Sequence, residues 1–422
     1  MSTSPDNGIS RNASKSLPTE LLNQIFTQVA THLQKARSSR RKCLLDLRLV
    51  CKSWSDAVIP IVLRSIRIKD VEQAQYLLEN WKTIFSYTHD FQPRVFPVHR
   101  LVLIDLFGDT ESKSHASIDK AVELIRLFSG NLRSLTLDFA SMGCPTPLVD
   151  AVKMAKSLKK LDIQSDRTAG SSDLANLLDA TPDLEELTIG YSAVPPMKFS
   201  ESALTKLRYL DFPYAYADAN YDDSSRYADL RGIVNICEKA GSSLKIIKCT
   251  PTEESGNGLL PVLKAVQETL EGLFTLSLCH QWDYHALFVE CPRLRVVESH
   301  PWDDLYQHSA DTIASAGWFS WPLLQNVRTL VFPNDDALDP WLEFFESAKK
   351  EEIFQPSATS RDKGLFRKLP HLKQCLFKCG VSDSLIEDFE AYGIECWMID
   401  DDLEPVEIMK LDAQLDTDLE DQ

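Results

Sequence analysis

The chain contains three six-residue stretches of one design: LRSLTL (residues 132–137), LKKLDI (158–163) and LEELTI (184–189). Each has apolar residues at its first, fourth and sixth positions. The fourth and sixth positions alternate with polar residues, and this period of two is typical of a strand with one buried face. The first position would pack where the strand begins. These stretches therefore predict short strands, one in each of a series of similar units.

The pattern recurs along most of the chain. Further copies begin at Val98, Leu207, Leu244, Leu273, Leu294, Val327 and Leu372. The first five units start 34, 26, 26 and 23 residues apart, and later separations reach 45 residues, which predicts insertions. Stretches with helical spacing of apolar residues, such as 118–128 and 174–178, lie between the strands. Each unit alone would leave an apolar face open, and stacking of neighbouring units would close it.

Units of this length and pattern resemble leucine-rich repeats. The resemblance implies an α/β fold over residues 98–399, an irregular solenoid with parallel strands on its concave face and helices or loops outside. The Asn or Cys that usually follows the third apolar position is not regular here, which is why we expect an irregular array. An ordinary α/β domain without repeats is the alternative interpretation.

Residues 17–66 predict a small all-helical module. Apolar residues have helical spacing in LPTELLNQIF (17–26), and again in the run that ends LRLVCKSW (47–54). Pro18 suits the first turn of a helix, and Pro60 would end or bend the second helix. So short a segment cannot bury all of its large apolar side chains, which favours packing against a partner or the next domain.

The ordered pair LPTELLNQIF and LRLVCKSW resembles the F-box motif, so the chain resembles F-box/leucine-rich-repeat proteins of the fungal type. The resemblance implies that residues 17–66 bind a Skp-family adaptor, and through it a cullin. By position, the adaptor contacts would be Leu17, Pro18, Ile25, Phe26, Leu49, Val50, Lys52 and Trp54. Leu21, Leu22, Leu45 and Val58 are expected in the module's own core. The stretch between Phe26 and Leu47 is longer than usual in the family and is basic.

The implied function is that of a substrate-recognition adaptor in a Skp/cullin/F-box-type E3 ubiquitin ligase, with the repeat array binding a protein substrate. A scaffold or regulatory protein that binds the Skp-type adaptor without delivering a substrate is the alternative. We expect no enzymatic activity, because no Gly-rich phosphate loop, G-x-S-x-G or H-E-x-x-H motif is present. No cofactor and no metal is expected, and the histidines at 280, 285, 300 and 308 are interpreted as loop or packing residues.

The charge distribution favours protein partners. The net charge is −17, yet residues 1–66 carry an excess of Lys and Arg, so the acidic charge lies in the rest of the chain. Nucleic acid is therefore not expected as a partner, since phosphate binding needs clustered cations. No stretch is long and apolar enough for a membrane span. Ten scattered cysteines and no secretory signal predict a reducing compartment, cytoplasmic and/or nuclear.

Three further segments complete the predicted organisation: a disordered tail (1–16), a helical linker (67–97) and an acidic, solvated and mobile tail (400–422). In the array, residues that point outward from the strands or lie in aromatic-rich loops are candidates for substrate binding. We select Arg133, Lys160, Glu186, Tyr209, Tyr214 and Trp282.

Overall fold

The computed structural model describes residues 19–32, 44, 46, 47, 49–85, 98–104, 111–138, 144–164, 171–190, 194–213, 230–250, 259–277, 289–300, 322–332, 369–378, 380, 381 and 383–417. The chain divides into two compact units. Unit 1 comprises Met1–Ile66 and Asn80–His99, and unit 2 comprises Arg67–Glu79 and Arg100–Gln422.

In unit 1, helices α1 (Thr19–His32) and α3 (Lys52–Leu63) pack against each other. Leu22, Phe26 and Val58 are buried between them, and the Phe26 ring meets the Trp54 ring edge-on at a centroid distance of 5.1 Å. The core positions predicted for Leu22 and Val58 are confirmed, whereas Leu21 is exposed. Leu45 lies outside the described residues.

Pro60 does not end α3, which continues to Leu63, so of the two expectations for this proline only a bend remains. One expectation about local structure in the first hundred residues is wrong. A strand, β1 (Ser65–Ile68), occupies residues for which the sequence predicts helix or linker. Helix α4 (Val71–Phe85) then covers the stretch after residue 71 that has helical spacing.

The described strands form one twelve-stranded sheet in which spatial order equals chain order, from β1 to β12. Every pairing from β2 to β12 is parallel. The remaining strands are β2 (Arg100–Leu103), β3 (Ser134–Asp138), β4 (Lys160–Gln164), β5 (Glu186–Gly190), β6 (Tyr209–Pro213), β7 (Ile246–Thr250), β8 (Gly272–Ser277), β9 (Val296–His300), β10 (Thr329–Phe332), β11 (Gln374–Phe377) and β12 (Glu395–Met398).

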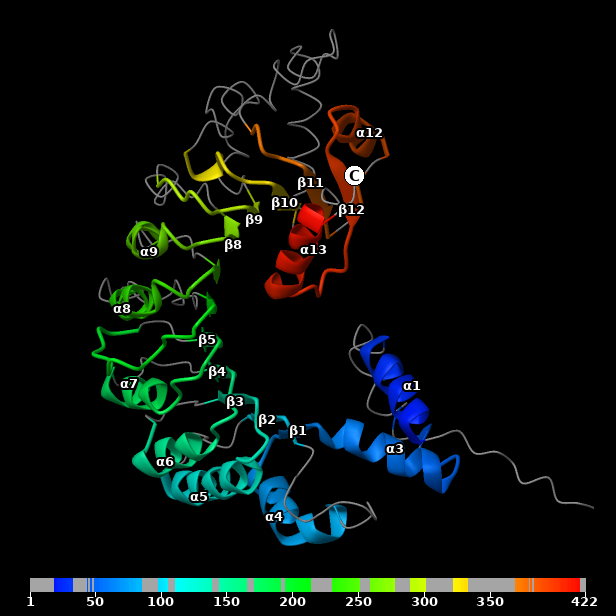
Figure 1. Ribbon diagram of the computed structural model, residues 1–422. Coiled ribbons are helices and arrows are strands. Elements are labelled where there is room, and N and C mark those ends of the chain that lie inside the picture. Colours follow the sequence, from blue (N-terminus) through cyan, green and yellow to red (C-terminus); the bar gives the residue numbers. More distant parts are fainter. Residues whose placement is uncertain are drawn as a thin grey trace, which may run out of the picture. The chain divides into compact units, whose positions relative to one another are not determined.

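Helices connect many of these strands and lie on one face of the sheet, so that unit 2 is an α/β solenoid like a leucine-rich-repeat array (Figure 1). They are α5 (Glu111–Phe128), α6 (Thr146–Met154), α7 (Ser171–Asp179), α8 (Arg231–Ala240), α9 (Leu259–Val266) and α12 (Asp383–Ala391), with a 3₁₀ turn at Pro322–Leu324. We call the opposite, concave face of the sheet the inner face.

The register explains the repeated apolar pattern. Leu135, Leu161 and Leu187 are neighbours on successive strands and are fully buried between sheet and helices. One predicted unit has the wrong phase. Leu273, expected at a first position, pairs with Ile247 and so occupies a fourth position, which makes Leu270 the first residue of that unit.

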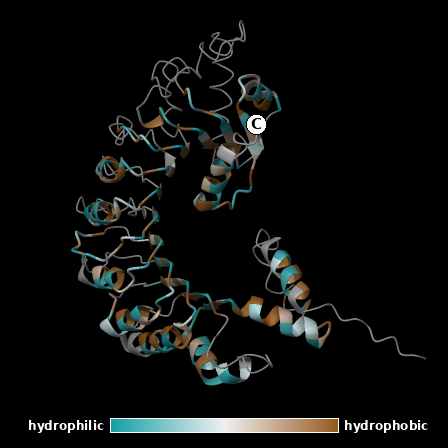
Figure 2. Ribbon diagram, in the orientation of Figure 1, coloured by the Kyte–Doolittle hydropathy of each residue, from teal (hydrophilic) through white to brown (hydrophobic). Residues whose placement is uncertain are grey.

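The prediction of a solvated, mobile acidic tail is wrong over residues 405–417, which form helix α13 (Pro405–Thr417). Figure 2 shows hydrophobic residues among the hydrophilic ones of this helix. Ile408 and Met409 are buried against the inner face of the sheet. The acidic composition alone predicts the wrong structure, because burying Ile408 and Met409 against the sheet lowers the free energy of the folded chain.

Candidate protein-interaction surfaces

Among the described residues of unit 1, four large apolar side chains are exposed. Leu21 and Ile25 lie one helical turn apart on α1, and their side chains are 45% and 43% exposed. Leu49 and Val50 lie in the turn before α3 and are 76% and 60% exposed. That turn is held by backbone hydrogen bonds from Leu49 N to Asp46 O (3.0 Å) and from Val50 N to Leu47 O (3.2 Å). These residues offer apolar area that a partner protein can bury.

Of the eight adaptor contacts that the sequence predicts, four are exposed, namely Ile25, Leu49, Val50 and Lys52. Trp54 is half-buried, with one side of its ring against Phe26.

Phe26 is a correction. Its side chain is 2% exposed and belongs to the core of the helix pair, because it follows Leu22 on the face of α1 that packs on α3. Phe26 can therefore position the contact surface but cannot form it. Leu17 and Pro18 lie outside the described residues.

On unit 2, the inner face of β3 to β5 is polar. Lys160 and Glu186 are register neighbours and form an ion pair with a Nζ–Oε2 distance of 2.9 Å. On the same strands, the Gln164 side chain donates a hydrogen bond to Asp162 (2.7 Å). We call these four residues the polar strip. They are half-exposed, and exposed ion pairs of this kind contribute little to stability. They are available for recognition.

Arg133 lies next to the polar strip. It directly precedes β3, its side chain is exposed, and its carbonyl oxygen accepts hydrogen bonds from the backbone N–H groups of Lys159 (2.8 Å) and Lys160 (2.9 Å). The structure thus brings together three predicted surface residues, Arg133, Lys160 and Glu186. Tyr214 and Trp282 lie outside the described residues.

From β6 to β11 the inner face carries a row of apolar side chains, and α13 packs on this row. The buried cluster consists of Tyr209, Ile246, Phe274, Val296, Val331 and Leu376 from the strands with Ile408 and Met409 from α13. Ile399, Leu403, Val406 and Leu411 pack around it. Gly272 is part of this fit, because a Cβ there would lie 2.7 Å from the Met409 sulfur. Tyr209, predicted as a contact for a substrate, is 3% exposed and is buried beneath this helix instead.

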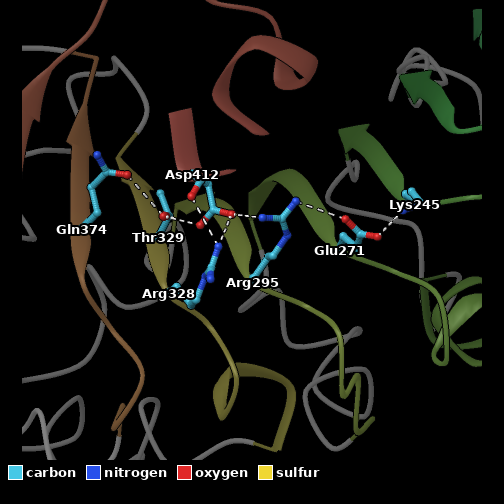
Figure 3. Close-up of polar contacts among 7 residues, drawn as sticks. All are labelled: Lys245, Glu271, Arg295, Arg328, Thr329, Gln374 and Asp412. Atoms are coloured by element: carbon cyan, nitrogen blue, oxygen red, sulfur yellow. Dashed lines mark hydrogen bonds and ion pairs between the residues drawn. The ribbon is translucent and has the colours of Figure 1, made fainter. Parts of the chain in front are cut away.

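A buried carboxylate fastens α13 to the sheet. Asp412, which is 0% exposed, accepts hydrogen bonds from Arg328 Nη2 (2.9 Å) and Thr329 Oγ1 (2.8 Å), and also from Arg295 (Figure 3). Arg295 also forms an ion pair with Glu271, with an Nη2–Oε2 distance of 3.1 Å. Glu271 in turn pairs with Lys245, whose Nζ lies 2.5 Å from Glu271 Oε1. Burial raises the pKa of Glu271, but Lys245 and Arg295 outweigh this, so its pKa lies below the ordinary value.

A second carboxylate lies where the polar and apolar parts of the inner face meet. The Tyr209 hydroxyl donates a hydrogen bond to Asp211 Oδ2 (3.2 Å), and Lys248 Nζ is 3.7 Å from the same oxygen. Burial raises the pKa of Asp211 above its ordinary value, and Lys248 and the hydrogen bond from Tyr209 only partly counteract it. Burial likewise raises the pKa of Tyr209.

Sequence reasoning missed α13 as part of this surface, although two signals for it exist. Residues 405–411 (PVEIMKL) begin with a proline suited to a first helical turn and continue with apolar residues. The outward positions are polar in β3 to β5, whereas each strand from β6 to β11 has an apolar residue among them. A strip of that kind in a parallel sheet needs a cover.

These surfaces are suited to binding. Among the described residues, no group of three or more His, Cys, Asp or Glu side chains could hold a metal ion. Within the same ranges, no helix has the length and hydropathy that a membrane span requires.

No protein-family model matches the chain, and no curated protein matches it. Among solved structures, one similar chain belongs to the crystal structure of a TLR13–ssRNA13 complex. The two share 14% identity with a TM-score of 0.32; the match covers 72% of this chain and 39% of that one. The fold assignment therefore rests on the strand order and register described above.

Proposed function

We propose that this protein is the substrate-recognition adaptor of a Skp/cullin/F-box-type E3 ubiquitin ligase. In this proposal, α1 and α3 with the turn before α3 bind a Skp-family adaptor, which links the protein to a cullin. Unit 2 binds the protein substrate. The proposal rests on the F-box-like sequences at 17–26 and 47–54 and on the apolar side chains that they expose.

The observation that carries the proposal is the exposure of Leu21, Ile25, Leu49 and Val50 in so small a helical unit. Ile25, Leu49 and Val50 are at positions where the F-box resemblance expects adaptor contacts. Burying such apolar side chains against a partner removes their surface from water, which favours binding. Their neighbours Leu22 and Phe26 hold the helices together and are not free to take part.

The test is binding of the full-length protein to a purified Skp-family adaptor. Ile25→Asp together with Leu49→Asp should abolish binding, because both put a charge on the proposed contact without touching the core. Met154→Asp is the matched control, since Met154 on α6 is equally exposed at 52% but belongs to unit 2. Binding by the double variant at wild-type strength would refute the proposal.

For the substrate, the proposed contact is the polar strip with Arg133. Its alternating charges favour a protein surface of complementary charges over a uniformly charged ligand. Exchanging the charges with Lys160→Glu and Glu186→Lys keeps the ion pair and reverses the pattern. A protein captured by the wild type with the proteasome blocked should be lost by this variant. Its cellular level should also rise when residues 17–66 are deleted; an unchanged level would instead support a scaffold that delivers no substrate.

A further inference from the structure

The last two strands of the sheet place two cysteines side by side. Cys375 on β11 and Cys396 on β12 are register neighbours, so their side chains leave the sheet on the same face. Neighbouring strands are ~4.8 Å apart, and Cα separations of ~4.4–6.8 Å suit a disulfide. Both cysteines are present as free thiols, and the Cys396 Sγ lies 3.9 Å from Ile394 O.

The two thiols differ in access. Cys375 is 0% exposed, whereas Cys396 is half-buried on β12, which is the last strand of the sheet among the described residues. Small oxidants can therefore reach Cys396 first. The hydrogen bond from Cys375 holds the pKa of Cys396 below its usual value, although burial and Glu390 oppose this, and a thiolate is the reactive form. Burial raises the pKa of Cys375.

No other described cysteine combines these features. Cys144, Cys237, Cys249 and Cys291 are buried. Cys51 in unit 1 is exposed and directly precedes α3. It serves as an internal reference for an exposed thiol outside the sheet.

We propose that Cys375 and Cys396 form a reversible dithiol–disulfide site that reacts with low-molecular-weight disulfides such as glutathione disulfide. The Cys396 thiolate attacks one sulfur of glutathione disulfide and releases one glutathione thiolate. Cys375 then loses its proton and attacks the Cys396 sulfur of the mixed disulfide, which releases the second. The protein loses two electrons and two protons, and one glutathione disulfide becomes two glutathione molecules.

The bond would fix the end of the solenoid. It joins β11 to the terminal strand β12 and closes the loop that contains α12. Directly after β12, Ile399 donates a backbone hydrogen bond to Phe377 O (2.8 Å), and Ile399 and Leu403 pack into the cluster under α13. Oxidation should therefore slow amide hydrogen exchange in β12.

The experiment treats the full-length folded protein with glutathione disulfide, blocks remaining thiols by alkylation, and maps the peptides by mass spectrometry. The expected product is a peptide pair linked through Cys375 and Cys396, lighter by two hydrogen atoms and restored by a reducing agent. Cys51 should carry only a glutathione adduct. In Cys375→Ser, Cys396 should accumulate the mixed disulfide, and in Cys396→Ser, Cys375 should stay reduced.

Three results with the wild-type protein would overturn the proposal. The first is that Cys396 keeps its glutathione adduct while Cys375 can still be alkylated after unfolding. The second is that Cys375 and Cys396 stay reduced while Cys51 reacts, and the third is that Cys396 forms a disulfide with a cysteine other than Cys375. All three are read from the wild-type protein, so the result does not depend on how well the serine variants fold, nor on the proposed function.

Discussion

Asp412 Oδ2 lies 2.9 Å from Arg328 Nη2, and this contact joins the C-terminal helix to a strand that begins more than 80 residues earlier in the chain. The carboxylate is fully buried, whereas the Arg295 and Arg328 side chains are 24% and 18% exposed. Removing the carboxylate leaves these two largely buried guanidinium groups without their shared negative partner.

We therefore expect Asp412→Ala to lower the free energy of unfolding by about 3–5 kcal/mol, measured by urea denaturation. Lys410→Ala on the same helix is the control, because Lys410 is exposed and surface changes usually stay within about 0.5 kcal/mol. Equal effects of the two substitutions would mean that the buried contact does not hold α13.

Ile408→Asp should release α13 from the inner face, because the change puts a charge into the apolar cluster. Hydrogen exchange should then become faster in β7 and β8, which contact α13, and stay unchanged in β3 and β4. Glu407→Asp, at an exposed neighbouring position, should leave both regions protected. Faster exchange across the whole sheet would instead indicate that the solenoid unfolds as one unit.

Gly232→Ala should destabilise unit 2 by about 2–3 kcal/mol, because the start of α8 lies against Val194 and Pro195 in the segment between β5 and β6. The Gly232 N–H donates to Val194 O (2.8 Å), and an added Cβ would lie 2.5 Å from that same oxygen. Gly130→Ala is the matched control, since nothing lies within 4 Å of its Cβ position. Thermal denaturation of the two variants should separate them; a wild-type melting temperature for Gly232→Ala would contradict the close packing.

Asp211 should make the free energy of unfolding of the wild type depend on pH in a way that is absent from Asp211→Asn. Its pKa is raised in the folded state, so the folded chain binds this proton more tightly than the unfolded chain. The resulting stabilisation is complete below the ordinary carboxyl pKa of about 3.9 and is lost as the pH rises through the folded value. The difference in unfolding free energy, wild type minus variant, should therefore increase as the pH falls from neutral to about 4. A difference independent of pH would show that burial does not dominate at Asp211.

The repeat pattern was strong enough in the sequence to predict most strands and the face that they bury. Leu135, Leu161 and Leu187 fall on the buried face because strand periodicity leaves them one choice. The sequence assigned the first position of one unit to Leu273 instead of Leu270, because Leu273, Leu276 and Leu278 also place apolar residues at first, fourth and sixth positions. Local spacing cannot choose between two such frames, and the hydrogen bonds to β7 decide it.

In unit 1, helical periodicity identified the apolar side chains but not their partners. Ile25 and Phe26 are adjacent in sequence and apolar alike, yet Ile25 is exposed and Phe26 is buried against Trp54. Their difference depends on the angle at which α3 meets α1, which no single helix encodes.

The sequence by itself determined the repeating α/β units, because the period of two and the spacing between units are local properties of the chain. Only the tertiary structure decided which part of the inner face is covered. Residues 400–422 are acidic enough to predict a solvated tail, but Ile408, Met409 and Asp412 meet an apolar strip and two arginines that strands far apart in the sequence bring together. Burial of those groups against one another is a property of the assembled sheet, and it leaves the polar strip of β4 and β5 as the candidate surface for a partner.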